Sequence, residues 1–129
     1  MRELATGCSA STTFVIADLH FGDERTCRSR PFRDAAEMGS ETVLRWNETV
    51  SPHDVVYVLG DIGGQSHFGT IRQLHGTKHL IVGNADNLRA VASAKLFASL
   101  SIARWLRRFL LTHIPVHPSQ LGSRAINVH

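Results

Sequence analysis

Three short runs of apolar, mostly β-branched residues alternate with longer segments that carry helix signals. The runs occupy residues 12–17, 54–59 and 78–82. Runs of this length and composition are typical of strands that are buried on both faces, as strands in parallel sheets are. Parallel neighbours need a crossover connection, which is usually a helix. The alternation therefore predicts a layered α/β fold built around a parallel sheet.

The segment after the first run carries the clearest helix signals. Asp34 can cap a helix, and Glu37 three positions later completes a pattern that resembles a capping box. Ser51-Pro52 breaks the helix, so we expect it to end at about residue 48, whereas residues 21–33 read as a polar loop. Further helices are expected at 67–74 and 87–98, and further strands at 100–105, 109–111 and 125–128.

Length and composition indicate the general class of the chain. A chain of 129 residues with 43% hydrophobic residues predicts a single domain, spanning residues 1–129, with a core of its own. The 14 Lys and Arg residues and 11 Asp and Glu residues nearly balance, and no run of like charge indicates a nucleic-acid-binding tail. No stretch approaches the ~18 apolar residues of a membrane span, and residues 1–11 do not resemble a secretory signal. We therefore expect a cytoplasmic protein in which Cys8 and Cys27 are free thiols.

Polar residues that can bind metal follow four of the predicted strands. In chain order they are Asp18, His20, Asp61, Asn84 and His113. Ligands of open α/β sheets bind at the carboxyl ends of the strands, where these residues would lie. Asp18 and His20 are two residues apart, so their side chains point to the same side if the strand alternation continues. We therefore expect the five side chains to form one site.

Carboxylate, imidazole and amide groups in one site indicate a divalent metal ion. A mixture of nitrogen and oxygen ligands suits Mn, Fe, Zn or Ni better than calcium, which takes oxygen ligands only. Two such ions ~3.5–4 Å apart would polarise a phosphoryl oxygen and generate hydroxide near neutral pH. These are the requirements of phosphate ester hydrolysis, so the pattern favours that reaction.

Eight segments of the chain also match a known protein family, in the order in which the family has them. They are ADLHFGD (17–23), RPF (30–32), EM (37–38), RWN (45–47), DVVYVLGD (54–61), LIVGNAD (80–86), THIPV (112–116) and INVH (126–129). In this combination the chain resembles the calcineurin-like metallophosphoesterases, of the small bacterial and phage phosphohydrolase type. The resemblance implies a layered α/β/β/α metallophosphoesterase sandwich, incomplete at the C-terminus, around a centre of two divalent ions.

The resemblance also implies a role for each candidate residue. Asp18 and His20 would hold the first ion, Asn84 and His113 the second, and Asp61 would bridge the two. A metal-bound hydroxide would attack phosphorus in line, with Asp61 and Asn84 as the candidate catalytic residues. The implied function is hydrolysis of phosphate mono- or diesters. The predicted partner is a phosphorylated small molecule or nucleotide; no membrane partner and no oligomeric state are predicted.

Two departures from the family pattern predict impaired hydrolysis. Ala85 stands where the family has a histidine that contacts the phosphate, and losing general acid help typically costs about 10²–10⁴-fold. The chain ends at His129, just before the family's Gly-His-x-His motif, so we expect a C-terminally truncated domain. The alternative function is a degenerate domain that binds metal or phosphate without turnover.

The remaining basic residues admit more than one interpretation. Four arginines crowd the segment after His20, at Arg25, Arg28, Arg30 and Arg33. They form a solvated basic loop, or one of them binds substrate phosphate; the resemblance favours Arg30 for that role. A nucleic-acid-binding surface is a third and less favoured reading. Most other histidines, His67 and His79 among them, are expected to be solvated, and His117 is a weaker candidate for a spare metal ligand.

Overall fold

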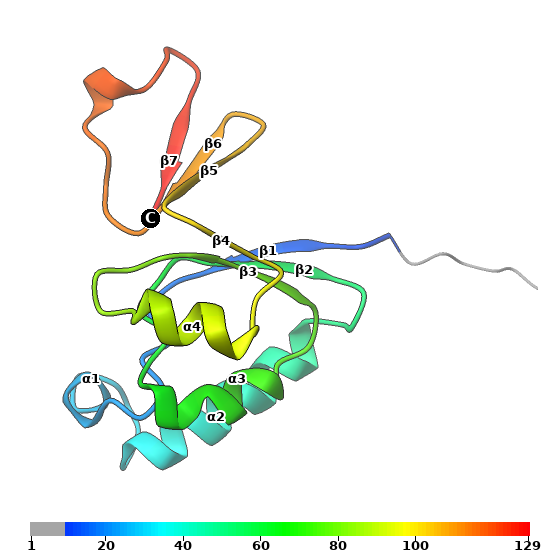
Figure 1. Cartoon of the computed structure of the whole chain (residues 1–129), viewed down its shortest axis with the longest axis vertical. Helices are drawn as coiled ribbons and strands as arrows, with labels where there is room; N and C mark the ends of the chain where they lie inside the picture. Colours follow the sequence, from blue (N-terminus) through cyan, green and yellow to red (C-terminus); the bar gives the residue numbers. More distant parts are fainter. Residues whose placement is uncertain (1–9) are drawn as a thin grey trace, which may run out of the picture.

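The computed structural model describes residues 10–129, and within them a parallel sheet forms the centre of the molecule (Figure 1). This sheet has four strands in the order β1-β2-β3-β4 within the described residues. The strands are β1 (Thr13–Ile16), β2 (Val55–Val58), β3 (Thr77–Ile81) and β4 (Ser99–Ser101). All neighbouring pairs are parallel, which confirms the predicted α/β class.

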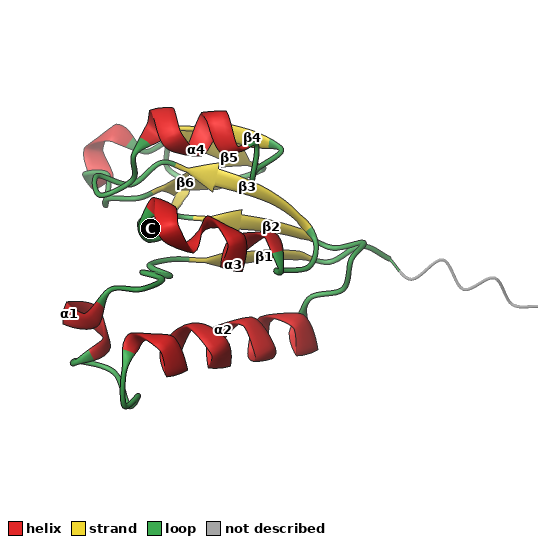
Figure 2. Cartoon of the chain, turned by 60° about the horizontal axis from the view of Figure 1, so that its bottom comes forward, coloured by secondary structure: helices red, strands yellow, loops and turns green. Residues whose placement is uncertain are grey.

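The longer helices lie on one face of this sheet, as Figure 2 shows. They are α2 (Ala35–Thr49), α3 (Phe68–Arg72) and α4 (Leu88–Ala94). Apolar residues of these helices pack with Val56, Val58 and Leu80 of the strands in one core cluster. The cluster is closed to solvent, since Val58, Ile71 and Leu80 are each 0% exposed. A short helix, α1 (Glu24–Cys27), stands in the connection from β1 to α2.

A second sheet lies on the other face of the parallel sheet (Figure 1). Its strands are β5 (Ala103–Leu106), β6 (Phe109–Thr112) and β7 (Ile126–Val128), in that order across the sheet. β5 and β6 are antiparallel, whereas β6 and β7 are parallel. Tyr57, Leu59, Ile81 and Leu111 form the buried cluster between the sheets. Helices, parallel sheet and second sheet therefore follow one another as layers.

The strand β2 shows why its run of residues is apolar throughout. Val56 and Val58 point into the helix-side cluster, while Tyr57 and Leu59 point into the cluster between the sheets. Successive side chains of a strand point to opposite faces, so a strand covered on both sides needs apolar residues at every position.

Several predicted element boundaries are wrong. The strand expected at 100–105 is two strands in different sheets, β4 and β5, which are separated only by Ile102. The loop expected at 21–33 contains α1, because Asp23 caps a helical turn. The helix expected at 67–74 is the 3₁₀ turn η1 (Gln65–His67) followed by α3. The helix expected at 87–98 ends at Ala94, because Lys95 takes a left-handed conformation.

The free-thiol prediction holds for Cys27, which is buried; burial raises the pKa of its thiol and makes it less reactive. Cys8 lies outside the described residues. Among residues 10–129, the helices are too short or too polar for any of them to cross a bilayer. A second 3₁₀ turn, η2 (Pro118–Gln120), lies in the connection from β6 to β7.

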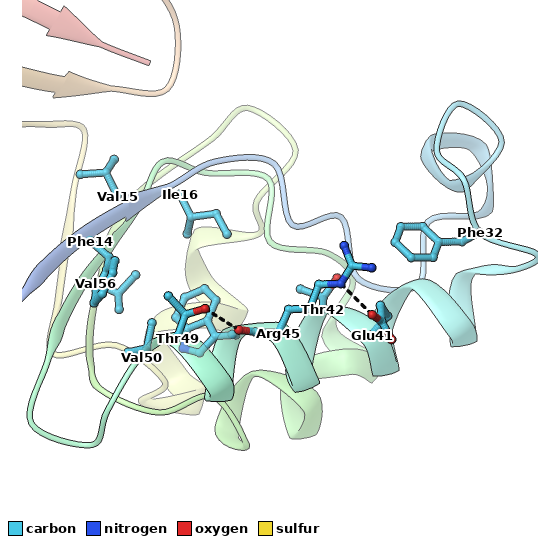
Figure 3. Close-up of a pocket in the computed structure, with 11 residues that line it drawn as sticks. Phe14, Val15, Ile16, Phe32, Glu41, Thr42, Arg45, Thr49, Val50 and Val56 are labelled. Carbon is cyan, nitrogen blue, oxygen red and sulfur yellow. Dashed lines mark hydrogen bonds and ion pairs between the residues drawn. The ribbon is translucent and has the colours of Figure 1, made fainter.

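A groove lies on each face of the outer strand β1. Among the described residues, only β2 pairs with it in the sheet. On the helix side, a groove of about 360 Å³ runs between β1 and α2 and is lined by Phe14, Ile16 and Trp46 (Figure 3). On the opposite side, a groove of about 650 Å³ is lined by Val15 and by residues of the second sheet such as Trp105.

Candidate metal centre

The loops that follow β1, β2, β3 and β6 bring all five predicted ligands together. His20 Nε2 lies 3.8 Å from Asp18 Oδ1 and 3.7 Å from Asp61 Oδ2. His113 Nε2 lies 3.5 Å from Asp61 Oδ2 and 2.8 Å from Asn84 Oδ1. One ligand atom each from Asp18, Asp61 and His113 lie within 4.8 Å of one another. The predicted convergence of these side chains is therefore present.

Three of the ligands stand on left-handed backbone. Among residues 10–129, five non-glycine residues have positive φ, and these include Asp18 (55°), His20 (48°) and Asp61 (52°). Asp, Asn and His tolerate this conformation better than other side chains do. Non-glycine residues in sparsely populated conformations cluster at functional sites, where the surrounding structure has to hold them. The backbone at these positions therefore indicates a site.

Backbone hydrogen bonds continue past the strand ends and hold these residues in place. The Asp18 amide donates to the Gly60 carbonyl at 3.3 Å, and the His20 amide donates to the Asp61 carbonyl at 2.9 Å. The Phe21 amide then donates to the Ile62 carbonyl at 3.1 Å. The loops after β1 and β2 are thus bonded to each other residue by residue, which fixes the spacing of their side chains.

Two glycines allow the loops to approach this closely. A Cβ at Gly83 would lie 2.5 Å from Asp61 Oδ1 and 2.6 Å from the Asp61 amide nitrogen. A Cβ at Gly60 would lie 2.6 Å from His113 Nδ1 and 2.7 Å from the Cα of Gly83, and Gly60 also has a φ of +88°. A side chain at either position would push the ligands apart. This close approach is the physical reason for glycine in Gly60-Asp61 and Gly83-Asn84.

Both histidines turn a lone pair of electrons toward the other ligands. His113 Nδ1 lies 2.7 Å from the Leu59 carbonyl oxygen, which can only accept, so Nδ1 carries the proton. His20 Nδ1 lies 3.4 Å from Asp23 Oδ2, an acceptor that favours the same tautomer. The Nε2 atoms are then left with lone pairs that face carboxylate and amide oxygens. A cation among these atoms would relieve their mutual repulsion.

Asp23 contacts a candidate ligand and was not predicted from the sequence. Its carboxylate accepts hydrogen bonds from the Thr26 hydroxyl at 2.7 Å, the Thr26 amide at 3.2 Å and the Arg25 amide at 2.9 Å. The hydrogen bond from the Thr26 hydroxyl is the main reason that the pKa of Asp23 is lowered. The carboxylate therefore stays charged behind His20. An Asp that caps a helical turn directly after a ligand was the available signal.

Asp86 is a second missed residue, and it fixes the geometry of the site from outside the ligand set. Its carboxylate accepts hydrogen bonds from the Gly83 amide at 2.8 Å, the Asp61 amide at 3.0 Å and the Ile62 amide at 2.9 Å. These bonds join the loop after β3 to the loop after β2. The spacing of Asp86, three residues after Gly83, is the signal for a side chain that bonds its own turn.

Arg30 lies behind Asp18. Its Nη2 donates to the Asp18 carbonyl oxygen at 2.7 Å, and its Nη1 lies 3.6 Å from the sulfur of Met38. The guanidinium therefore supports the left-handed backbone at Asp18; contact with a substrate phosphate stays a prediction. The weaker ligand candidate His117 bonds locally, with its Nδ1 2.7 Å from Ser119 Oγ.

The donor set fits a divalent metal ion. It combines two carboxylates, two imidazoles with free lone pairs and an amide oxygen, a mixture that suits first-row transition metals. Asp61 is held rigidly, since its Oδ1 also accepts from the Ala85 amide at 3.1 Å. Its side chain is 12% exposed and that of His113 is 13% exposed, so the inner part of the site is largely shielded from water.

Two curated proteins share part of this sequence. The chain is 37% identical over 83 residues to the Gene 66 protein of Mycobacterium phage L5, across 59% of this chain and 40% of that protein. It is 35% identical over 51 residues to an uncharacterized protein of Methanocaldococcus jannaschii, across 38% of this chain and 29% of that protein. The chain thus spans less than half the length of the curated relatives it matches. No family model matches the sequence.

A solved structure shares the fold. The crystal structure of a protein of unknown function from Aquifex aeolicus superposes with a TM-score of 0.67 at 21% sequence identity. The match covers 81% of this chain and 61% of the Aquifex chain. The likeness at this level of identity concerns the fold alone.

Proposed function

We propose that this chain is a metal-dependent phosphoesterase of the calcineurin-like type, which hydrolyses phosphate mono- or diesters. The observation that carries the proposal is the convergence of five lone-pair donors from four loops, three of them on left-handed backbone. The order of helices, parallel sheet and second sheet supports the layered sandwich that the sequence motifs imply.

Asp61 lies close to both candidate histidines, because His20 Nε2 and His113 Nε2 lie 3.7 Å and 3.5 Å from its Oδ2 atom. Asp18 lies beside His20, and Asn84 lies beside His113. Asp18 and His20 would hold one divalent ion, Asn84 and His113 would hold a second, and Asp61 would be available to both. The nitrogen and oxygen donors favour Mn, Fe, Zn or Ni. When bound, such ions polarise a phosphoryl oxygen and provide a nucleophile near neutral pH.

The residues of the chain prepare the site for these ions and for the ester. The Leu59 carbonyl and the Asp23 carboxylate hold the two imidazoles with Nε2 turned inward. The carboxylates of Asp18, Asp23 and Asp61 give the site a negative potential, which would repel a phosphate unless bound cations offset it.

Metal binding and hydrolysis by the same variants test the proposal. The purified chain is titrated with Mn²⁺ in a calorimeter and assayed with an aryl phosphodiester and an aryl phosphate. We expect Mn²⁺ binding and Mn²⁺-dependent hydrolysis in the wild type. Loss of a residue that only hydrogen-bonds a ligand lowers metal affinity by about 10–100-fold. Asp61→Asn removes a ligand itself, so it should weaken Mn²⁺ binding by more than that. Asp34→Asn, a helix cap on α2, is the matched control and should bind Mn²⁺ like the wild type.

Two results of these assays would contradict the proposal. A wild type that neither binds Mn²⁺ nor hydrolyses either ester would overturn it. A wild type that hydrolyses the esters equally well after exhaustive metal removal would overturn the metal requirement.

A second candidate function is metal binding without turnover, and Ala85 favours it. Ala85 is exposed, and it lines a cavity beside Asp61 in which its methyl group offers no proton. The variant Ala85→His tests this candidate, because a general acid contributes about 10²–10⁴-fold to such reactions. A gain in the hydrolysis rate would assign the impairment to this position. No hydrolysis in either protein, despite Mn²⁺ binding, would establish the non-catalytic function.

A further inference from the structure

The cavity that Ala85 lines lies directly beside the candidate metal ligands. It has a volume of about 440 Å³, and its lining includes His20 and Asp61 as well as Gln65, Ser66 and His67 of the turn η1. This volume lies within the range of small-molecule binding sites. Any molecule in this cavity would therefore touch both the candidate metal centre and η1.

His67 is the side chain of η1 with the most defined environment. It was expected to be solvated, but it is half-buried and packs against Gly22, in the loop that carries His20. A Cβ at Gly22 would overlap the imidazole ring of His67, and Gly22 has a φ of +78°. Both the contact and the backbone conformation therefore favour glycine at this position. Among residues 10–129, no hydrogen bond engages either nitrogen of His67. The His67 ring is therefore packed in place, and both of its nitrogens are available for a hydrogen bond to a ligand.

The charge of the cavity limits what it can bind. Its lining includes the carboxylates of Asp23 and Asp61 and, from η1, the Gln65 amide, the Ser66 hydroxyl and the His67 imidazole. The three groups of η1 can all donate hydrogen bonds. With cations bound at the carboxylates, the cavity would suit an anion that carries several acceptor oxygens.

We propose that this cavity is the substrate subsite, that it takes a small, hydrophilic phosphate ester, and that His67 donates a hydrogen bond to a phosphate oxygen of that ester. The inference rests on the proposed function, because bound cations would have to offset the negative charge of Asp23 and Asp61 for an anion to bind here. His67 and Ala85 line the same cavity. His67 would then supply a hydrogen bond to phosphate that the methyl group of Ala85 cannot supply.

Calorimetry with inorganic phosphate as the probe tests this inference. Phosphate is titrated into the Mn²⁺-loaded wild type and into His67→Ala, His67→Gln and Gly22→Ala. The control is His53→Ala, an exposed histidine outside the cavity. We expect His67→Ala to weaken phosphate binding by roughly 10- to 100-fold, the effect of losing one hydrogen bond to a charged group. His67→Gln should recover part of the affinity, and His53→Ala should match the wild type.

Mn²⁺ binding to the same variants separates the two proposals. If the wild type does not bind Mn²⁺, the proposed function fails and this inference fails with it. If Mn²⁺ binds, but His67→Ala holds phosphate as tightly as the wild type, the inference is overturned and the proposed function stands. If His67→Ala also loses Mn²⁺ binding, His67 has a structural role and the inference is again overturned. Gly22→Ala should displace the His67 ring and so lower phosphate affinity as His67→Ala does. A folded Gly22→Ala protein that binds phosphate as tightly as the wild type would contradict the proposed role of His67.

Discussion

The helix-covered parallel sheet and the second sheet differ in how completely they are buried, and the loops after strands of both carry candidate metal ligands. In the parallel sheet, Val58 and Leu80 are 0% exposed, whereas in the second sheet Trp105 is 53% exposed and Ile126 is 41% exposed. The closed region carries four of the predicted ligands, and the open region carries His113 alone. The candidate site therefore joins a closed part of the molecule to a less protected one.

The two regions also hold their ligands by different means. Backbone hydrogen bonds between neighbouring loops fix the ligands that follow β1 and β2. The His113 ring is held by a bond from Nδ1 to the Leu59 carbonyl, and the backbone on either side of His113 is held by Asn127 of its own sheet. The Asn127 amide donates to Thr112 Oγ1 at 2.8 Å and to the Leu110 carbonyl at 3.0 Å, and its oxygen accepts from the Val116 amide at 2.7 Å. Disturbing the second sheet should therefore affect one ligand and spare the others.

The two tryptophans give the largest expected contrast between the regions. Trp46 is 6% exposed in the closed core and donates from Nε1 to the His75 carbonyl at 3.0 Å. Trp46→Ala should lower the free energy of unfolding by about 3–5 kcal/mol. Trp105→Ala, in the open sheet, should cost no more than about 1 kcal/mol. Urea unfolding of both variants measures the contrast, and equal costs would abolish the distinction between the regions.

Leu111→Ala tests whether the second sheet can loosen by itself. Leu111 is 1% exposed in the cluster between the sheets, and its truncation should cost about 2–5 kcal/mol. Hydrogen exchange should show faster exchange in β5, β6 and β7 than in β1 and β2. Mn²⁺ affinity should fall because His113 directly follows β6.

The neighbour Leu110, half-buried outside that cluster, provides the control for the truncation. Leu110→Ala should leave both exchange in β1 and Mn²⁺ affinity close to wild type. Uniform loosening of both sheets in Leu111→Ala would show that the molecule opens as one unit.

Asp23→Asn probes the outer partner of a ligand in the closed region. The amide cannot hold the charge that faces His20 Nδ1, so Mn²⁺ affinity should fall by about 10–100-fold. Asp34→Asn is the matched control, because Asp34 caps α2 through the Glu37 amide at 2.8 Å. Both variants should lower the melting temperature, and only Asp23→Asn should change Mn²⁺ affinity in calorimetry. An equal loss in both variants would mean that the ligands respond to general destabilisation.

His79 gives the smallest expected effect, and it lies where the two sheets meet. Its ring stacks on Tyr57 with centroids 4.9 Å apart, and burial is the main reason that its pKa is lowered. The unfolded chain then takes up a proton at higher pH than the folded chain does. Stability should therefore fall as pH drops below about 6.5, the unfolded value, down to the folded pKa. His79→Gln should flatten this part of the pH–stability curve; an unchanged slope would remove His79 as its source.

The sequence predicted the closed region far better than the open one. Buried parallel strands consist of continuous apolar runs, and ligands at strand ends are neighbours in space whatever the connections between them. The second sheet offered weaker signals. The segment around Ile102 contains neither Gly nor Pro, so nothing in it marks the point at which the chain leaves one sheet for the other. The roles of Asp23 and Asp86 depend on bonds to backbone amides, which spacing alone indicates poorly.

The left-handed conformation at Asp18, His20 and Asp61 limits which substitutions these positions can accept during evolution. Under the proposed function, these positions are restricted by ligation and also by the small set of side chains that accept positive φ. His113 and Asn84 do not have positive φ, so this second restriction does not apply to them. In lineages released from selection for the metal, His113 and Asn84 should diverge first. Asp18 and Asp61 should give way mainly to Asn or Gly, and aligned homologues would show this order of loss.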